Sequence, residues 1–190
     1  LIKGVVRNKD EDNKKLKLSN TILDSKGTIV SKEVISLSIR KGESSPFSIQ
    51  VKSIKKPNLW SPESPYLYTV ETSILDAKTN TVIDKVVNPL GFRWFSFDAD
   101  KGFYLNGKHY KLNGVCRHQD QQFLCSALSE EQHRRDMQMI KDLGANFIRI
   151  SHYPQDDAIL EQCDKLGLIA WEEIPIVNYI NLNKAFAESS

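Results

Sequence analysis

The apolar residues of this chain repeat with two different periods, one in each half of the sequence. In residues 1–97, apolar and polar residues alternate, which favours strands with one buried face. The alternation is clearest in residues 15–19, 34–40, 47–51 and 66–72. Residues 98–190 instead combine short apolar segments with helical patterns. Because the two periods need different packing, we expect two domains, 1–97 and 98–190.

The distribution of charge supports this division. Residues 1–97 contain 16 Lys and Arg against 10 Asp and Glu, a net charge of +6, whereas residues 98–190 contain 10 against 14, a net charge of −4. The whole chain carries only +2, which gives no electrostatic case for binding nucleic acid. No apolar segment approaches the roughly 18 residues of a membrane-spanning helix. We therefore predict neither a nucleic-acid partner nor a membrane.

The first half has the pattern of an all-β domain. Clusters of turn residues at 24–27, 41–46 and 76–80 separate the predicted strands. Roughly seven short strands in about 95 residues are typical of an immunoglobulin-like sandwich. Residues 1–97 contain no Cys, so the version of this fold with an inter-sheet disulfide is excluded.

The second half predicts helices between parallel strands. Ser129 and Gln132 form a capping-box sequence, which predicts a helix that ends at Gly144. A second helix is indicated by the apolar spacing of residues 159, 163 and 166, and Gly167 ends it. Apolar strands are predicted at residues 110–115, 145–151 and 168–171. This β-α-β-α-β order indicates a parallel sheet, either open or barrel-like.

Polar residues follow each of these three strands. They lie in residues 116–120, at Arg149 with residues 151–154, and at Glu172 and Glu173. In parallel α/β folds, ligands bind at the carboxyl ends of the strands because the loops there converge. We therefore expect one shared pocket, in which Asp120 is either a residue that binds hydroxyl groups or a solvated loop residue.

Seven short motifs, taken in order, resemble glycoside hydrolase family 2, the family of β-galactosidases, β-glucuronidases and β-mannosidases. They lie at residues 60–68, 91–93, 105–108, 113–118, 148–154, 163–168 and 171–173. The resemblance implies an all-β immunoglobulin-like sandwich followed by a partial α/β segment, the first three βα units of a (β/α)8 TIM barrel.

The same resemblance implies a retaining exo-β-glycosidase, with a β-galactoside as the expected substrate. Retaining hydrolysis needs two carboxylates about 5–5.5 Å apart. In this family they follow barrel strands four and seven, so we expect both beyond residue 190. Glu172 and Glu173 are not this pair, because neighbours on a strand face opposite sides. We therefore predict no catalytic residue here and an inactive isolated chain.

The resemblance also assigns roles to residues near the predicted pocket. His118 and His152 look like the two histidines beside the cleaved sugar, and Arg149 looks like an arginine that orders the pocket. Glu173 matches a position that binds magnesium in some bacterial β-galactosidases, but Pro175 stands where those enzymes have a second, histidine ligand. We predict a carbohydrate partner, no metal and no other cofactor. The predicted substrate-binding residues are His118, Asp120, Arg149, His152 and Glu173.

Other residues receive packing roles or secondary roles. Trp60 is predicted to pack in the sandwich or at an interface. Tyr153 and Trp171 are predicted either to offer aromatic surfaces for stacking on a sugar or to serve in packing. Cys116 is predicted to be a small buried residue, and His133 is predicted to lie on a helix surface.

Two other functions remain open from the sequence. One is a separate carbohydrate-binding or scaffolding sandwich, which does not need the β-α-β-α-β half. The other is a complete small α/β enzyme, which three parallel strands support poorly because their edges stay unpaired. The chain begins at Leu1 without a Met or a signal-peptide pattern, so we expect a piece of a longer protein whose compartment stays open. The open barrel edges are expected to be covered by a second copy of the chain, by rearranged packing or by disorder.

Overall fold

The computed structural model describes residues 1–52 and 54–175, which form two compact units. Unit 1 comprises Leu1–Leu59 and Tyr66–Phe92, and unit 2 comprises Trp60–Pro65 together with the residues from Arg93 onward. The boundary predicted between residues 97 and 98 falls inside strand β7 (Phe95–Asp98), and the assignment of domains stays a prediction. None of the helices in the described ranges is both long and apolar enough to cross a membrane.

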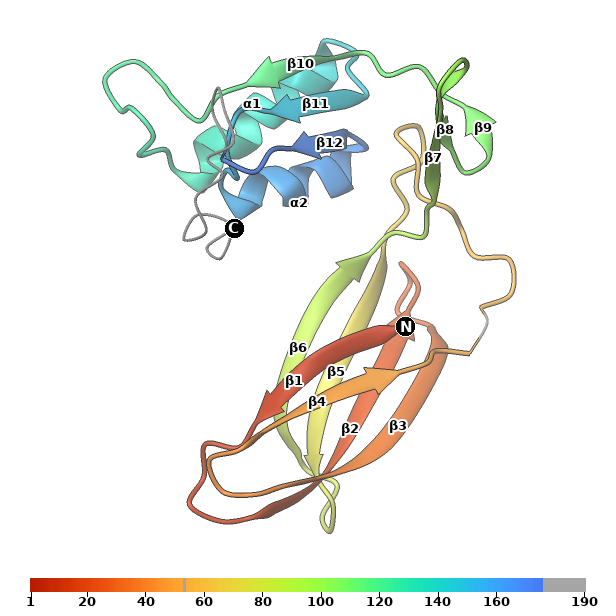
Figure 1. Ribbon diagram of the computed structural model, residues 1–190, viewed down its shortest axis with the longest axis vertical. Coiled ribbons are helices and arrows are strands. Elements are labelled where there is room, and N and C mark those ends of the chain that lie inside the picture. The colour runs from red at the N-terminus through yellow and green to blue at the C-terminus, as the bar shows by residue number, and fades with distance from the viewer. Residues whose placement is uncertain (53, 176–190) are drawn as a thin grey trace. The chain divides into compact units, whose positions relative to one another are not determined.

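Unit 1 consists of two antiparallel sheets (Figure 1). A four-stranded sheet has the order β3-β2-β5-β6, and β1 pairs with β4 in a second sheet. Ile22, Tyr68 and Val70 form a buried cluster on the larger sheet, and Ile2 of β1 packs against it. The strands are β1 (Ile2–Arg7), β2 (Lys14–Leu23), β3 (Ile29–Ile39), β4 (Ser44–Ile49), β5 (Tyr68–Asp76) and β6 (Val82–Leu90).

One predicted turn of unit 1 is partly wrong. Residues 41–46 were expected to be a turn, but β4 already begins at Ser44 and includes Pro46, which lies opposite Val5 of β1. Proline cannot donate a hydrogen bond to a sheet and is therefore tolerated mainly on edge strands. β4 has β1 as its only sheet partner among the described strands, so Pro46 lies in such a strand.

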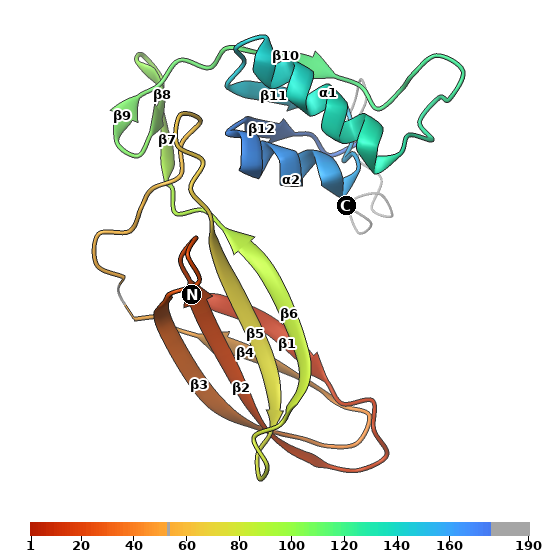
Figure 2. The ribbon, with the colours of Figure 1, turned by 180° about the vertical axis from the view of Figure 1, so that it is seen from behind.

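Unit 2 contains a small antiparallel sheet and a parallel sheet with two helices (Figure 2). The small sheet consists of β7, β8 (Gly102–Leu105) and β9 (Lys108–His109). In the parallel sheet, β11 lies between β10 and β12. Its elements are β10 (Gly114–Arg117), α1 (Glu130–Asp142), β11 (Phe147–Ile150), α2 (Asp157–Leu166) and β12 (Ile169–Glu172).

Both predicted helices are confirmed, together with their ends. The Ser129 side chain accepts from the Gln132 N–H, and the Gln132 side chain accepts from the Ser129 N–H, which completes the capping box of α1. Gly144 follows α1 with a φ of 85°, and Gly167 ends α2 with a φ of 74°. Glycine adopts this left-handed conformation without the steric cost that a side chain brings.

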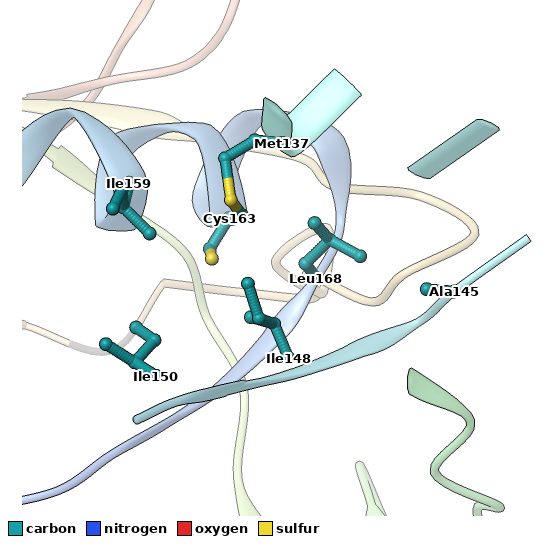
Figure 3. Close-up of a cluster of buried hydrophobic side chains, with 7 residues drawn as sticks. All are labelled: Met137, Ala145, Ile148, Ile150, Ile159, Cys163 and Leu168. Carbon is teal, nitrogen blue, oxygen red and sulfur yellow. The ribbon is translucent and has the colours of Figure 1, made fainter. Parts of the chain in front are cut away.

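Both helices cover the same face of the parallel sheet. The core between them contains side chains from β11 and from both helices, shown in Figure 3. Its members are Met137, Ala145, Ile148, Ile150, Ile159, Cys163 and Leu168. Burial raises the pKa of the Cys163 thiol to about 12, so this group stays neutral and acts in packing.

Trp60 has a packing role, but it is buried in unit 2 and not in the two sheets of the sandwich. Only 2% of its surface is exposed, and its indole Nε1–H donates to the backbone oxygen of Asp164 at 2.8 Å. The guanidinium of Arg93 lies 4.6 Å from the centre of its ring. At Gly167, an added Cβ would approach the Pro62 backbone to 2.5 Å. The segment Trp60–Pro65 is thus packed tightly against the C-terminal end of α2.

Candidate functional site

The register of the parallel sheet decides which side chains share a face. Cys116, Arg149 and Trp171 are aligned across β10, β11 and β12. Ile148 and Ile150 alternate with Arg149 and are packed under the helices. Arg149 therefore lies on the face that the helices leave uncovered. Arg117 and Glu172 are aligned with Ile150 and belong by register to the opposite face.

Three predicted site residues meet at the carboxyl ends of β11 and β12. Arg149 Nε donates to Glu173 Oε1 at 2.6 Å, and Arg149 Nη2 lies 3.0 Å from His152 Nδ1. His152 Nδ1 also lies 3.1 Å from Glu173 Oε2. These three side chains are each between 22% and 42% exposed, so the cluster is reachable by a ligand.

The charge of Glu173 is fixed by its neighbours. The hydrogen bond from Arg149 lowers the pKa of the Glu173 carboxyl, partly opposed by desolvation, and the bond to His152 lowers it further. Glu173 is therefore ionised at neutral pH.

His152 can present either hydrogen-bonding role to a ligand. Its Nδ1 makes only one of its two contacts at a time, because it carries either a hydrogen or a lone pair. In the neutral ring, Nε2 is an acceptor when Nδ1 donates to Glu173. When Nδ1 accepts from Arg149, Nε2 carries the hydrogen and is a donor.

His118 lies next to this cluster. The rings of His118 and His152 are 5.1 Å apart in an edge-to-face arrangement, and the Tyr153 ring is 6.5 Å from His118. Tyr153 Oη accepts a hydrogen bond from the backbone N–H of Gln119 at 3.2 Å. The structure thus brings together His118, Arg149, His152 and Glu173, four of the five predicted residues.

Asp120 is not part of this group. It is exposed in the loop after β10, and no hydrogen bond or ion pair joins it to another residue in the described ranges. Trp171 is 53% exposed on the same face as Arg149, as a stacking surface would require. The prediction that Cys116 is buried is wrong, because Cys116 is exposed and its Sγ lies 3.8 Å from Arg149 Nη1. It lies on the face of the sheet that α1 and α2 leave uncovered.

Behind the site, a second cluster surrounds Arg117. Arg117 is buried and donates from Nε and Nη2 to Asp136 Oδ2 at 3.2 and 2.7 Å. Arg117 Nη2 also lies 3.0 Å from His133 Nδ1. The prediction that His133 lies on a helix surface is wrong, because its exposed fraction is 0%. Arginine cannot accept a hydrogen bond, so His133 Nδ1 is the acceptor and the ring is neutral.

This buried histidine should make the stability of unit 2 depend on pH. Desolvation, followed by the charge of Arg117, lowers the pKa of His133 below 6.5, although Asp156, Asp136 and Glu130 oppose the shift. Below about pH 6.5, His133 therefore binds a proton more readily in the unfolded chain than in the folded chain, which favours unfolding. The free energy of unfolding should be fully maintained above pH 6.5 and should fall as the pH drops below it.

Urea unfolding at pH 7.5 and pH 5.5 tests this expectation. The His133→Gln variant keeps a polar side chain but cannot titrate, so it should lose less stability between the two pH values than the unchanged chain. An equal loss in both proteins would contradict a role for His133.

The magnesium position suggested by family resemblance does not fit this arrangement. Both Glu173 oxygens are within hydrogen-bond distance of Arg149 or His152, so a guanidinium stands where a cation would approach. Pro175 supplies no side-chain ligand. Among residues 1–52 and 54–175, no group of three or more His, Cys, Asp and Glu is arranged to hold a metal ion.

Comparisons with known proteins identify the family. A model described as "Glycosyl hydrolases family 2" matches residues 2–93, and one described as "Glycosyl hydrolases family 2, TIM barrel domain" matches residues 99–189. The chain therefore belongs to glycoside hydrolase family 2. Its fold is the family's sandwich followed by the start of the TIM barrel, as the sequence predicted.

Individual relatives agree with this assignment. A β-glucuronidase crystal structure from Bacteroides uniformis is 48% identical, with a TM-score of 0.93 over 98% of this chain and 22% of that one. A putative β-glucuronidase of Formosa agariphila is 44% identical over 86% of this chain and 19% of its own length. A β-galactosidase of Thermoanaerobacter pseudethanolicus is 32% identical over 84% of this chain and 21% of its own length. The chain thus spans about a fifth of the length of these curated relatives.

Proposed function

We propose that the chain is part of a retaining exo-β-glycosidase and supplies one wall of its sugar-binding pocket. The arrangement of His118, Arg149, His152 and Glu173 at the strand ends supports this proposal. Ionised Glu173 and Arg149 hold the His152 ring, whose Nε2 would bind a sugar hydroxyl as donor or acceptor. His118 and the exposed face of Trp171 would contact the same sugar, and Asp120 would contribute from the loop after β10.

Membership of the family does not fix the sugar, so the substrate is part of the proposal. The sequence led us to expect a β-galactoside, and a 32% identical relative carries the name β-galactosidase. The relatives at 44% and 48% identity carry the name β-glucuronidase. We therefore put a β-glucuronide first and a β-galactoside second.

The two catalytic carboxylates are proposed to lie outside these 190 residues. Retaining hydrolysis needs an acid/base and a nucleophile about 5–5.5 Å apart. Glu173 is unsuited to either role, because its two oxygens are held by Arg149 and His152. A carboxylate held ionised by a guanidinium is a poor proton donor.

A direct test compares the 190-residue chain with the complete protein that contains it. We expect no hydrolysis of nitrophenyl β-glucuronide, β-galactoside or β-mannoside by the chain alone. The complete protein should hydrolyse one of them with retention of the anomeric configuration, which NMR of the released sugar detects. Turnover by the chain alone that His152→Ala abolishes would contradict the proposal that the catalytic carboxylates lie outside these 190 residues.

The same experiment distinguishes the proposed glycosidase from a carbohydrate-binding or scaffolding module. Sugar binding by the complete protein without hydrolysis would favour a carbohydrate-binding or scaffolding module. Self-association at the edges of β10 and β12 stays a prediction, and sedimentation of the 190-residue chain tests it.

A further inference from the structure

The side chain of Gln155 ties together the two backbone segments that carry His118 and His152. Gln155 Nε2 donates to the backbone oxygen of Arg117 at 2.8 Å and to that of Ser151 at 3.0 Å. These two residues immediately precede His118 and His152 in the sequence. One amide group thus holds the carbonyl groups next to both histidines.

The orientation of this amide is determined by its surroundings. The guanidinium of Arg117 only donates, and its Nη1 lies 2.8 Å from Gln155 Oε1. The two backbone oxygens only accept, so the NH₂ group must face them. Both amide hydrogens and the amide oxygen of Gln155 are therefore used, and turning the group over would break all three bonds.

Gln155 is itself held by a buried anchor. Arg117, which binds its oxygen, is fixed by Asp136 of α1. The Ser151 N–H also donates to the Arg117 oxygen at 3.1 Å. The hydrogen bonds thus lead from α1 through Arg117 and Gln155 to the two strand ends, and in the described residues none of them joins Gln155 to a histidine side chain.

We propose that Gln155 is a positioning residue, which sets the spacing between the rings of His118 and His152. Without its amide, the Ser151 N–H still donates to the Arg117 oxygen, and Gln119 still bonds to Tyr153 and Asp156. The group that held the carbonyls next to both histidines is lost, so the 5.1 Å separation of the rings is held less firmly. The contribution to sugar binding rests on the proposed function, but the effect on ring spacing does not.

Two variants remove the amide in different ways. Gln155→Met keeps the length and removes every hydrogen bond. Gln155→Glu keeps an acceptor for Arg117 but places a carboxylate against the two backbone oxygens. Gln138→Ala is the matched control, because Gln138 is exposed and its side chain bonds only to Asp142 on the same helix.

NMR of the isotope-labelled 190-residue chain provides the first readout. The unchanged chain and Gln138→Ala should show a cross-peak between the ring protons of His118 and His152. Either Gln155 variant, shown by circular dichroism to keep its helices, should lose this cross-peak and shift both rings' resonances, while those of His109 stay unchanged. A folded variant that keeps the cross-peak would overturn the proposal, and so would its absence from the unchanged chain.

Kinetics of the complete protein provide the second readout. Because a displacement of about 1 Å can cost about 10²-fold in rate, Gln155→Glu should lower kcat by about tenfold or more. The change in KM should be smaller, since alignment matters most in the transition state. Loss of the cross-peak with unchanged kcat would support the positioning and contradict the proposed role of the histidines. The two proposals can therefore fail separately.

Discussion

Replacing His152 with Ala in the complete enzyme is expected to lower kcat/KM by about 10²–10³-fold, the range seen when one pocket donor to a transition state is removed. The His152 ring is held by Arg149 and Glu173, so the direction of its Nε2 is already set for the proposed contact with a sugar. Under the proposed function, alanine would leave a sugar hydroxyl without its partner, and it also removes one of the bonds to Glu173.

Steady-state kinetics on the preferred nitrophenyl glycoside measure this loss. His109→Ala is the matched control, because His109 is exposed in β9 and belongs to no part of the site. It should keep the original rate. A kcat/KM for His152→Ala within twofold of the unchanged protein would contradict a role for His152 in sugar binding.

Replacing Trp60 with Ala should cost unit 2 about 3–5 kcal/mol of unfolding free energy, the usual range for a large aromatic residue in a core. Trp60 is 2% exposed, and the change also leaves the Asp164 carbonyl without its donor and Arg93 without the ring beneath it. The loss is a large share of the 5–15 kcal/mol that stabilises a typical domain.

Urea unfolding followed by circular dichroism at 222 nm reports on the helices, which lie only in unit 2 within the described ranges. Trp94→Ala provides the comparison, because Trp94 is 54% exposed in the same unit. It should lose less than about 1 kcal/mol. Equal losses in the two variants would show that burial of Trp60 does not hold this unit together.

The helices were predictable because their signals are local. The capping box at Ser129 and the glycines at 144 and 167 act within one or two turns of the chain, and both helices end where these residues indicated.

The strand expected at residues 110–115 lies instead at Gly114–Arg117. In the residues before this strand, the side chain of the distant Asn146 accepts from the Asn113 N–H and donates to the Lys111 oxygen. These bonds take the place of sheet pairing. Neighbouring sequence carries no sign of this contact.

The hairpin of the small sheet has a clear signal in the sequence. Asn106 and Gly107 both have positive φ in the turn between β8 and β9. Asn-Gly is the strongest short-range indication of a hairpin, so the sequence did contain the information.

Part of the candidate site was also predictable. Counting strand ends placed Arg149, His152 and Glu173 together, because parallel strands end at one edge. Residue types alone could not reveal the direction of a side chain. His133 is buried against Arg117 although its helix is largely polar, and Gln155 has no motif that marks its bonds to two strands.

The composition of unit 2 has a consequence for the order of events during synthesis. Trp60 and its acceptor Asp164 are 104 residues apart, so Trp60 leaves the ribosome well before its partner exists. At about 5–20 residues per second, the delay is roughly 5–20 s. During that interval a large indole ring has no burial site, while the strands of unit 1 on both sides of it are already being made. During this interval the segment Trp60–Pro65 can be bound by chaperones, or can associate with other nascent chains on the same mRNA.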